Sequence, residues 1–477
     1  MRLVKLITLK KIKTLYNNCL AFLVFFFIFF IPGPLKVMAQ DNSPYSRYGL
    51  GDLVPLTNIT GRGMGGVSAA YNDPLTINFN NPATYSNFLA YSELRSKKFA
   101  SGRVILDVGI NFDSRTLKEK NIADKFTAYN ALFSHLQVGI PVGNKLGITF
   151  GLRPLSRISY KIDRVERLYD PITHLPIDSA LTEFSGNGGS YLASAGAGYK
   201  FGKNFSAGIN LGYLFGEKDY STKRQLINDT VDYAMSNFQT KTSFGKIFIN
   251  AGILFSDTLN KSKPKEKQFI LSIGAYGNMK RNLTASKDVI YETFTHDPTN
   301  GDIRLDSVSE LHNVKGIIVY PATYGAGFAI KKPEELKKRG WQLGVDFVQS
   351  QWSQYRYYNS MDSVQNNWSL HVGGELTPAV NPANKSYWKA VTFRAGFSFG
   401  PDYIKVGNKL PQYGVSFGLG LPIATQRGFG RNQFSLINLS LEYGKRGNNN
   451  NLLRENLFRL SLGFSLSDIW FIKKKYE

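Results

Sequence analysis

Apolar and polar residues alternate along most of the chain after residue 100. In the stretch 204–215, the odd positions from Phe205 to Phe215 are apolar or aromatic, whereas Ser206, Gly208 and Asn210 lie between them. A period of two is that of a β-strand, whose successive side chains point to opposite faces. The same alternation recurs throughout the chain, so the sequence predicts an all-β protein.

Fourteen segments show this alternation. They lie near 102–114, 128–142, 145–162, 189–201, 204–221, 237–256, 267–284, 314–331, 339–352, 366–377, 387–400, 411–422, 432–445 and 455–472. Tight turns such as 141–145 and 201–204 alternate with longer links, which lie at 163–188, 222–236, 285–313 and 353–365. Short periplasmic turns and longer outer loops follow one another in this way in membrane barrels.

A soluble β-sandwich would alternate in the same way, with its apolar face as the core. Two features favour a membrane barrel instead. The polar face carries many of the 45 glycines and several charges, which suits a wet or plugged lumen. The segments are about ten residues or longer, with aromatic residues near both ends. The predicted fold is therefore a transmembrane antiparallel β-barrel of about fourteen strands over residues 101–477, because only a closed sheet leaves no unpaired edge in lipid.

The first 39 residues have the composition of a secretory signal peptide. Five basic residues lie between Arg2 and Lys13, an apolar core follows at 20–31, and small residues precede a cleavage position near Ala39–Gln40. An uncleaved inner-membrane anchor is the alternative. Cys19, the single cysteine, lies in this segment, so the mature chain has no disulfide, thiol nucleophile or zinc-thiolate site. We predict export to the outer membrane of a Gram-negative cell.

The formal charge of the chain is +23. The signal peptide holds six basic residues and no acidic ones, and its removal leaves +17. An exported chain rarely meets nucleic acid, so we expect no nucleic-acid partner. Anionic lipid or lipopolysaccharide is the more natural partner for such a surface. Solvated lysines scattered over loops are the other interpretation.

Residues 40–100 lack the alternation and are rich in glycine, proline and polar residues. Side chains alone do not fill the lumen of a barrel of this size, so this segment is predicted to be a hatch inside it. Its stretch GRGMGG, 61–66, matches the dinucleotide-binding pattern. No buried strand precedes it, however, Pro74 and Pro82 preclude a long helix after it, and no acidic residue lies between Asp73 and Glu93. The glycines are instead expected to allow tight turns in a confined pore.

The stretch 62–86, RGMGGVSAAYNDPLTINFNNPATYS, resembles the N-terminal hatch of the FadL/TodX outer-membrane transporters. The matching residues are Gly63, Gly65, Gly66, Asn81, Pro82 and Ala83. Stretches 147–160, 320–330 and 388–422 resemble strands of the same family. The opening SPYSRYGLGDL and the end 465–477 are similar to Bacteroidetes barrels of this kind, although the chain does not end on an aromatic residue.

The resemblance implies passive uptake of a hydrophobic or amphipathic molecule, such as a fatty acid. In that family the hatch shifts and the molecule leaves sideways through the wall, which implies a kink in the third strand. Pro154 lies there, and proline cannot donate to the ladder. A strand end or a bulge without function is the alternative for Pro154. The alternative for the chain is a role without transport, as a barrel subunit of an outer-membrane secretion or assembly machine, as in PorV-like relatives, with protein subunits as partners.

The sequence gives little sign of catalysis, and we predict no catalytic residue, cofactor or metal. Five histidines are dispersed, and none forms the H-E-x-x-H motif. His371 and Glu375 share the inward phase of one strand, where a lumen hydrogen bond is favoured over a proton relay. The acidic stretch 296–306 lacks the spacing of a calcium loop and is predicted to be a turn. A barrel hydrolase with an embedded serine is the enzymatic alternative.

Overall fold

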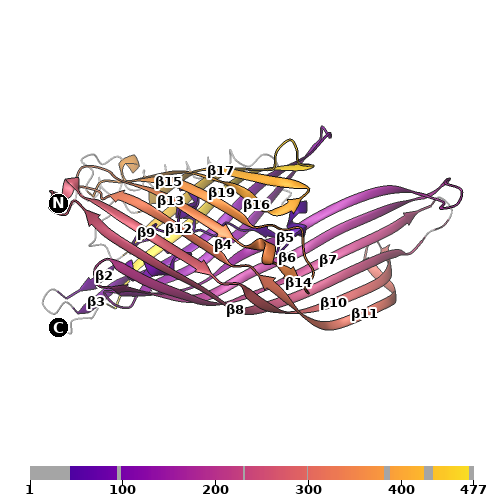
Figure 1. Cartoon of the computed structure of the whole chain (residues 1–477), viewed down its shortest axis with the longest axis horizontal. Helices are drawn as coiled ribbons and strands as arrows, with labels where there is room; N and C mark the ends of the chain where they lie inside the picture. Colours follow the sequence, from indigo (N-terminus) through magenta and orange to yellow (C-terminus); the bar gives the residue numbers. More distant parts are fainter. Residues whose placement is uncertain are drawn as a thin grey trace, which may run out of the picture. The chain divides into compact units, whose positions relative to one another are not determined.

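A computed structural model describes residues 43–93, 98–228, 231, 233–297, 299–380, 387–423 and 433–471. The predicted signal peptide, 1–39, lies outside the described residues. Within these ranges, nineteen strands form one antiparallel sheet (Figure 1). They are β1 (Asp52–Leu53), β2 (Ala90–Ser92), β3 (Phe99–Glu119), β4 (Lys125–Pro141), β5 (Leu146–Tyr169), β6 (Pro176–Phe201), β7 (Phe205–Ile227), β8 (Met235–Leu259), β9 (Phe269–Asn278), β10 (Arg281–Asp297), β11 (Gly301–Tyr320), β12 (Thr323–Lys332), β13 (Gly340–Ser350), β14 (Arg356–Tyr357), β15 (Asn367–Thr377), β16 (Thr392–Val406), β17 (Asn408–Pro422), β18 (Gln433–Arg446) and β19 (Leu453–Trp470).

Fourteen strands build the wall in the described part of the chain. Strands β1, β2 and β14 are pieces of two or three residues. Strand β10 continues β9 along β8, and β12 continues β11, so each of these pairs counts as one wall strand. Strand β19 pairs with β3 from Leu453↔Glu119 to Trp470↔Gly102 and closes the barrel. The predicted fourteen-stranded antiparallel barrel is confirmed.

The two faces of the wall differ as the alternation predicts. On β7, Leu211 is 53% exposed on the outside, whereas its neighbour Asn210 is 6% exposed and points into the lumen. On β3 the outward positions are apolar up to Phe112 and become polar at Ser114, which marks the outer limit of the apolar belt. Such a belt on a closed barrel matches the hydrocarbon layer of a membrane. Among the described residues, no helix is long and apolar enough to cross a membrane.

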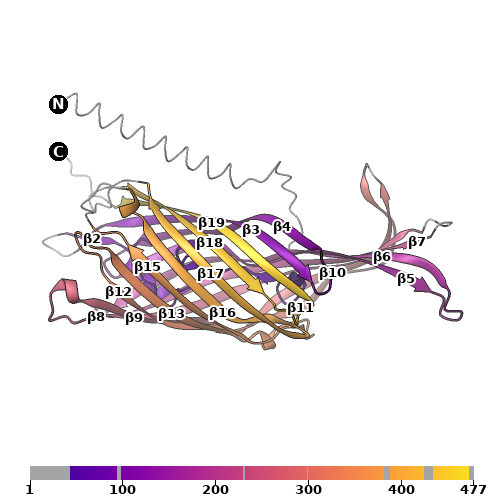
Figure 2. The ribbon, with the colours of Figure 1, turned by 90° about the horizontal axis from the view of Figure 1, so that it is seen from above.

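Six wall strands continue far beyond one end of the barrel. Figures 1 and 2 show β5, β6, β7, β8, β10 and β11 running past the ends of β3 and β4, and we call the parts beyond these ends the outer extension. About ten residues per strand suffice to cross a membrane, but β5 has 24 and β6 has 26. The interpretation of 163–188, 222–236 and 285–313 as outer loops was therefore wrong. Their alternation was hidden because both faces of the extension meet water and carry charges.

The segment before the wall runs through the lumen. It holds a 3-10 turn η1 (Pro44–Arg47), β1, a short helix α2 (Ile59–Arg62), a second 3-10 turn η2 (Pro82–Asn87) and β2. We call residues 43–92 the hatch. We call the end of the barrel where β3 starts and β19 ends the inner rim, and the opposite end the outer rim. Ser43 lies towards the outer rim, since it bonds Glu455 near the start of β19, and β2 lies at the inner rim, where Ala90 pairs with Gly102.

Candidate functional site

The glycines of the GRGMGG stretch bring the hatch against the wall. The stretch starts with the last two residues of the four-residue helix α2 and continues as a turn, in which Gly65 has φ +70° and Gly66 has φ +95°. A Cβ on Gly65 would lie 2.6 Å from the backbone nitrogen of Phe397 on β16. A Cβ on Gly63 would lie 3.0 Å from the Cα of Gly418 on β17. These glycines thus combine a left-handed turn with close backbone approach, and no strand–turn–helix unit of the dinucleotide type is present at this stretch.

Polar lumen side chains then fix this turn by accepting hydrogen bonds from its backbone. Asp346 on β13 accepts from the N–H groups of Ser68 and Ala69, at 2.5 and 2.6 Å. Ser416 on β17 accepts from the Gly65 N–H at 2.9 Å. His371 Nδ1 lies 2.7 Å from the Gly65 carbonyl oxygen, so this nitrogen carries the proton and donates. Each bond satisfies a backbone group of the hatch that is shielded from water, fully at Ser68 and Ala69 and partly at Gly65.

The Asn-Pro-Ala motif caps the turn η2 and seats it on the wall. The Asn81 side chain accepts from the Ala83 N–H at 3.1 Å, and its Nδ2 donates to the carbonyl oxygens of Ala69 and Ile253. Pro82 lies directly on two wall glycines: a Cβ on Gly208 would be 2.4 Å from Pro82 C, and one on Gly198 would be 2.4 Å from Pro82 O. The glycine-rich inner face therefore admits the hatch backbone at these points.

His371 and Glu375 do not form a proton relay with one another. His371 Nε2 contacts Ser369 at 2.8 Å, and its Nδ1 holds the hatch as described. Glu375 accepts from Arg394 at 2.6 Å and from the hydroxyl of Tyr71 at 3.2 Å. Both side chains therefore attach the hatch to the wall, which agrees with the favoured interpretation as lumen hydrogen bonds.

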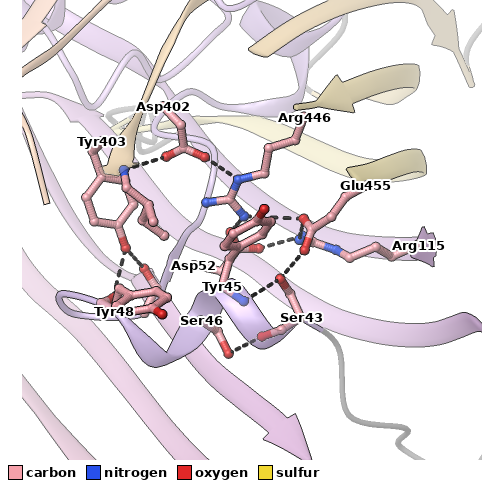
Figure 3. Close-up of polar contacts among 12 residues, drawn as sticks. Ser43, Tyr45, Ser46, Tyr48, Asp52, Arg115, Asp402, Tyr403, Arg446 and Glu455 are labelled. Atoms are coloured by element: carbon pink, nitrogen blue, oxygen red, sulfur yellow. Dashed lines mark hydrogen bonds and ion pairs between the residues drawn. The ribbon is translucent and has the colours of Figure 1, made fainter. Parts of the chain in front are cut away.

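A buried ion-pair network joins the hatch to the outer end of the wall (Figure 3). Arg446 donates to Asp402, and also to Asp52 at 3.0 Å and Glu455 at 3.3 Å. Arg115 bridges the same two acids, Asp52 and Glu455. Burial alone would raise the pKa of Asp52, but the two arginines outweigh it and lower the pKa below its usual value. The carboxylate thus stays charged and holds β1 in place.

Sequence reasoning did not find this network, because its members are scattered from Asp52 to Glu455 and each alone resembles a lumen charge. The outer half of the lumen is filled further by a buried apolar cluster. Its members are Tyr45, Leu50, Leu155, Leu192, Leu214, Phe244, Phe248, Leu283, Ala285, Ile318, Trp352, Tyr355, Tyr403, Ile404 and Leu410. Hatch, wall and the link around Trp352 thus pack together across the outer lumen.

The wall is split between β4 and β5 in its outer half. The two strands pair only from Leu136↔Leu152 to Pro141↔Gly147. Beyond this, β4 pairs with β3 alone, and β5 pairs with β6 and briefly with β1. Pro154 lies two residues past the last β4–β5 pair, at a register shift in the β5–β6 ladder. β5 is the third wall strand, so the structure places Pro154 where the third strand leaves its neighbour.

A cavity of about 800 Å³ lies at this split. Its lining includes Leu53, Asn111, Asp113, Phe133, Pro154, Arg157, Tyr191, Phe215, Phe244 and Arg459. Asn111 and Asp113 are buried lumen residues, whereas Phe133 and Tyr191 are 39% and 43% exposed on the outside of the wall. The cavity therefore connects the lumen with the outer surface of the barrel. Arg157 Nη1 is buried there and has no hydrogen-bond partner among the described residues.

The described residues show no arrangement of hydrolase or metal type. The pattern Gly-x-Ser-x-Gly occurs at 396–400 and 414–418, but both copies lie inside β16 and β17, not on the strand-to-helix turn that a nucleophile needs. The acidic stretch 296–306 spans the tight β10–β11 turn, in which Asp297 accepts from the N–H groups of Thr299 and Asn300. No group of three metal-ligating side chains is found within the described ranges.

Comparison with known proteins gives the family. A family model described as BamG matches residues 20–477. The chain belongs to the BamG family. No curated protein matches this BamG-family chain.

Several solved structures are similar in fold. A FadL homologue of Pseudomonas aeruginosa has 13% identity and a TM-score of 0.49, covering 89% of this chain and 100% of its own. The toluene transporter TodX of Pseudomonas putida has 14% identity and a TM-score of 0.49, covering 88% and 99%. The CymD monoaromatic hydrocarbon channel has 15% identity and a TM-score of 0.48, covering 88% and 98%. At these identities the similarity concerns the fold and leaves the substrate open.

Proposed function

We propose that the chain is an outer-membrane barrel that passes a hydrophobic or amphipathic small molecule sideways through the split between β4 and β5. The observation that carries this proposal is the cavity of about 800 Å³ that connects the lumen with the outside of the wall. Leu53, a hatch residue, forms part of its lining. Movement of the hatch therefore changes the cavity directly, and Pro154 keeps β5 from pairing further with β4.

The lining supports a ligand with an acidic head and an apolar body. Aromatic residues such as Phe133, Tyr191 and Phe215 offer the apolar contact. Arg157 offers a buried guanidinium nitrogen that lacks a partner among the described residues. An unpaired buried donor costs about 1–3 kcal/mol, so an anionic head bonded to it would be stabilised. A fatty acid has this chemistry.

Uptake of radiolabelled oleate tests the proposal. Cells would express the chain with Cys19 replaced by serine and one new cysteine, Ala131→Cys at the cavity, and would be treated with a bulky maleimide. The matched control is Ala395→Cys, which is also exposed on the outside of the wall. We expect the unlabelled variants to take up oleate above the rate of cells without the protein, and the maleimide to stop uptake only through Ala131→Cys. Equal rates in cells with and without the protein would contradict the proposal.

The role of Arg157 is tested in the same assay. Arg157→Leu removes the donor that we assign to the acidic head, whereas Arg167→Leu removes an arginine of the outer extension that bonds Ser179. Losing one charge-assisted bond of about 1.5–3 kcal/mol should raise the half-saturating oleate concentration roughly tenfold or more in Arg157→Leu. Arg167→Leu should leave it unchanged. An equal effect of both substitutions would show that Arg157 does not bind the acidic head of the ligand.

A second candidate function is a barrel subunit of an outer-membrane machine without transport. The filled outer lumen favours it, since the apolar cluster and the network around Arg446 join hatch and wall into one packed body. Gentle extraction followed by mass spectrometry of bound lipids and proteins separates the two functions. A retained hydrophobic ligand on an isolated barrel supports uptake, whereas a stoichiometric protein complex without ligand supports the subunit role.

A further inference from the structure

Several links at the inner rim are longer than membrane barrels usually have there, and two of them lie side by side. Seven residues, 333–339, connect β12 to β13, and fourteen residues, 378–391, connect β15 to β16. Periplasmic turns are usually short, as in the turn between β6 and β7, where Phe201 pairs with Phe205. The two long links are neighbours, because β13 pairs with β15 along its whole length.

Hydrogen bonds join the two links into one surface. The Val380 N–H donates to the Glu335 carbonyl oxygen at 3.0 Å. Arg339 donates to the carbonyl oxygens of Trp388 and Val391, at 2.9 and 3.2 Å. Gly340 completes the packing, since a Cβ there would lie 2.7 Å from the backbone nitrogen of Glu334. We call residues 331–339, 380 and 387–389 the basic platform.

The basic platform has exposed apolar residues at its centre and positively charged residues around them. Leu336, Trp388 and Val380 are 69%, 57% and 47% exposed. The basic residues are Lys331, Lys332, Lys337, Lys338, Arg339 and Lys389, against the two acids Glu334 and Glu335. The neighbouring β8–β9 link adds Lys261, Lys263 and Lys267, and its Glu266 lies 3.9 Å from Lys338. An exposed aromatic and an exposed leucine inside a charged rim form the arrangement of a protein-binding hot spot.

We propose that the basic platform is the docking site of an acidic periplasmic protein, whose carboxylates face the lysines around an apolar contact with Leu336 and Trp388. Charge complementarity favours an acidic partner, because a platform with six basic and two acidic residues attracts an acidic protein and repels a basic protein. Leu336 lies in the middle of the link, four residues beyond β12, past the wall that faces lipid. The inference is independent of uptake through the split, which lies between β4 and β5.

Site-specific photo-crosslinking in cells tests the docking site. A photoreactive amino acid replaces Leu336 or Trp388 in the full-length chain, and Val142, an exposed apolar residue of the β4–β5 turn on the same rim, is the control position. We expect one protein adduct at positions 336 and 388, absent at 142, and an acidic protein on identification by mass spectrometry. Lipid adducts alone, the same adducts at all three positions or no adduct at 336 and 388 would overturn the proposal.

The identified protein is then purified and titrated against the full-length barrel in detergent. The variant Lys337→Glu with Lys338→Glu reverses two exposed charges of the platform, and Lys145→Glu with Lys203→Glu reverses two exposed charges elsewhere on the same rim. The platform variant should raise Kd by about tenfold or more, and the control pair by less than about twofold. Heat-modifiable gel mobility shows that both variants fold. Equal effects of the two variants would mean a general charge effect and no docking site.

Discussion

At the scale of single residues, the hatch is held by lumen side chains that replace water around its backbone. Asp346 is the clearest case, because one carboxylate oxygen accepts two adjacent N–H groups of the hatch. Both N–H groups and the carboxylate are buried. Removing the acceptor therefore leaves two donors without a partner, which costs more than the bonds themselves contribute.

Asp346→Ala is therefore expected to loosen the hatch without unfolding the wall. Two unsatisfied donors at about 1 kcal/mol each lower the free energy of local opening by roughly 2 kcal/mol. Amide exchange over residues 60–80 should accelerate roughly thirtyfold, since about 1.4 kcal/mol corresponds to a factor of ten. Hydrogen exchange with mass spectrometry measures it. Asp219→Ala, which removes an acceptor of Gln239 on β8, should leave these peptides protected, and unchanged exchange in Asp346→Ala would contradict the anchor.

A comparison of Gly65→Ala with Gly202→Ala distinguishes the effect of backbone strain from that of a steric clash with the wall. Both glycines have positive φ, +70° and +62°, so both substitutions carry a strain of about 1–2 kcal/mol. A Cβ at Gly65 would clash with the backbone of Phe397, whereas a Cβ at Gly202 meets nothing within 4 Å. Only Gly65→Ala should therefore expose the hatch to added protease in detergent. Equal protease resistance of the two variants would show that the turn can shift away from β16.

The sequence located the hatch glycines but not their counterparts on the wall. Gly63, Gly65, Asn81 and Pro82 lie in one short stretch with a recognisable pattern. Asp346 lies 277 residues from Ala69 along the chain, and nothing near it distinguishes it from any other inward polar residue. Contacts of this kind depend on the register of the whole barrel, which local patterns do not contain.

At the scale of elements, alternation predicted the strands where one face meets lipid and failed where both faces meet water. The outer part of β11, residues 302–313, is exposed on both faces and has three register shifts against β10. Its pattern was therefore read as a loop. The alternation also did not reveal the split between β4 and β5. Apolar and polar residues alternate along β4 both where it pairs with two strands and where it pairs with β3 alone. Only the proline in β5 hinted at it.

The outer extension is expected to be dispensable for the wall. Deleting residues 162–184 and joining Lys161 to Ser185 through Asn-Gly keeps the register, because these two residues pair directly, and Asn-Gly favours a two-residue hairpin turn. The membrane-facing parts of β5 and β6 are untouched. The shortened chain should insert, resist trypsin and show the same heat-modifiable mobility as the full chain. Failure to fold would show that the extension stabilises the wall.

At the scale of the whole molecule, the barrel is a closed wall around a lumen that other parts of the same chain occupy. The wall closes through the long β19–β3 pairing and does not depend on the hatch for any of its main ladders. Many of the wall groups that contact the hatch are polar side chains such as Asp346, Glu375 and Glu455, which water can solvate when the hatch is absent. The wall is therefore expected to stay folded when the hatch is removed.

Deletion of residues 43–92 should consequently convert the barrel into a water-filled pore. Fourteen strands enclose a lumen wider than side chains alone can fill, and the inward residues that remain are largely glycine and polar. In planar bilayers we expect stable ion-conducting steps from the deletion variant and none from the full chain. The variant lacking residues 162–184 is the matched control, since it removes chain outside the lumen and should stay silent. Conducting steps from the full chain would mean that hatch and apolar cluster leave an open path, whereas a silent deletion variant would mean that the outer cluster around Trp352 and Tyr403 closes the lumen without the hatch.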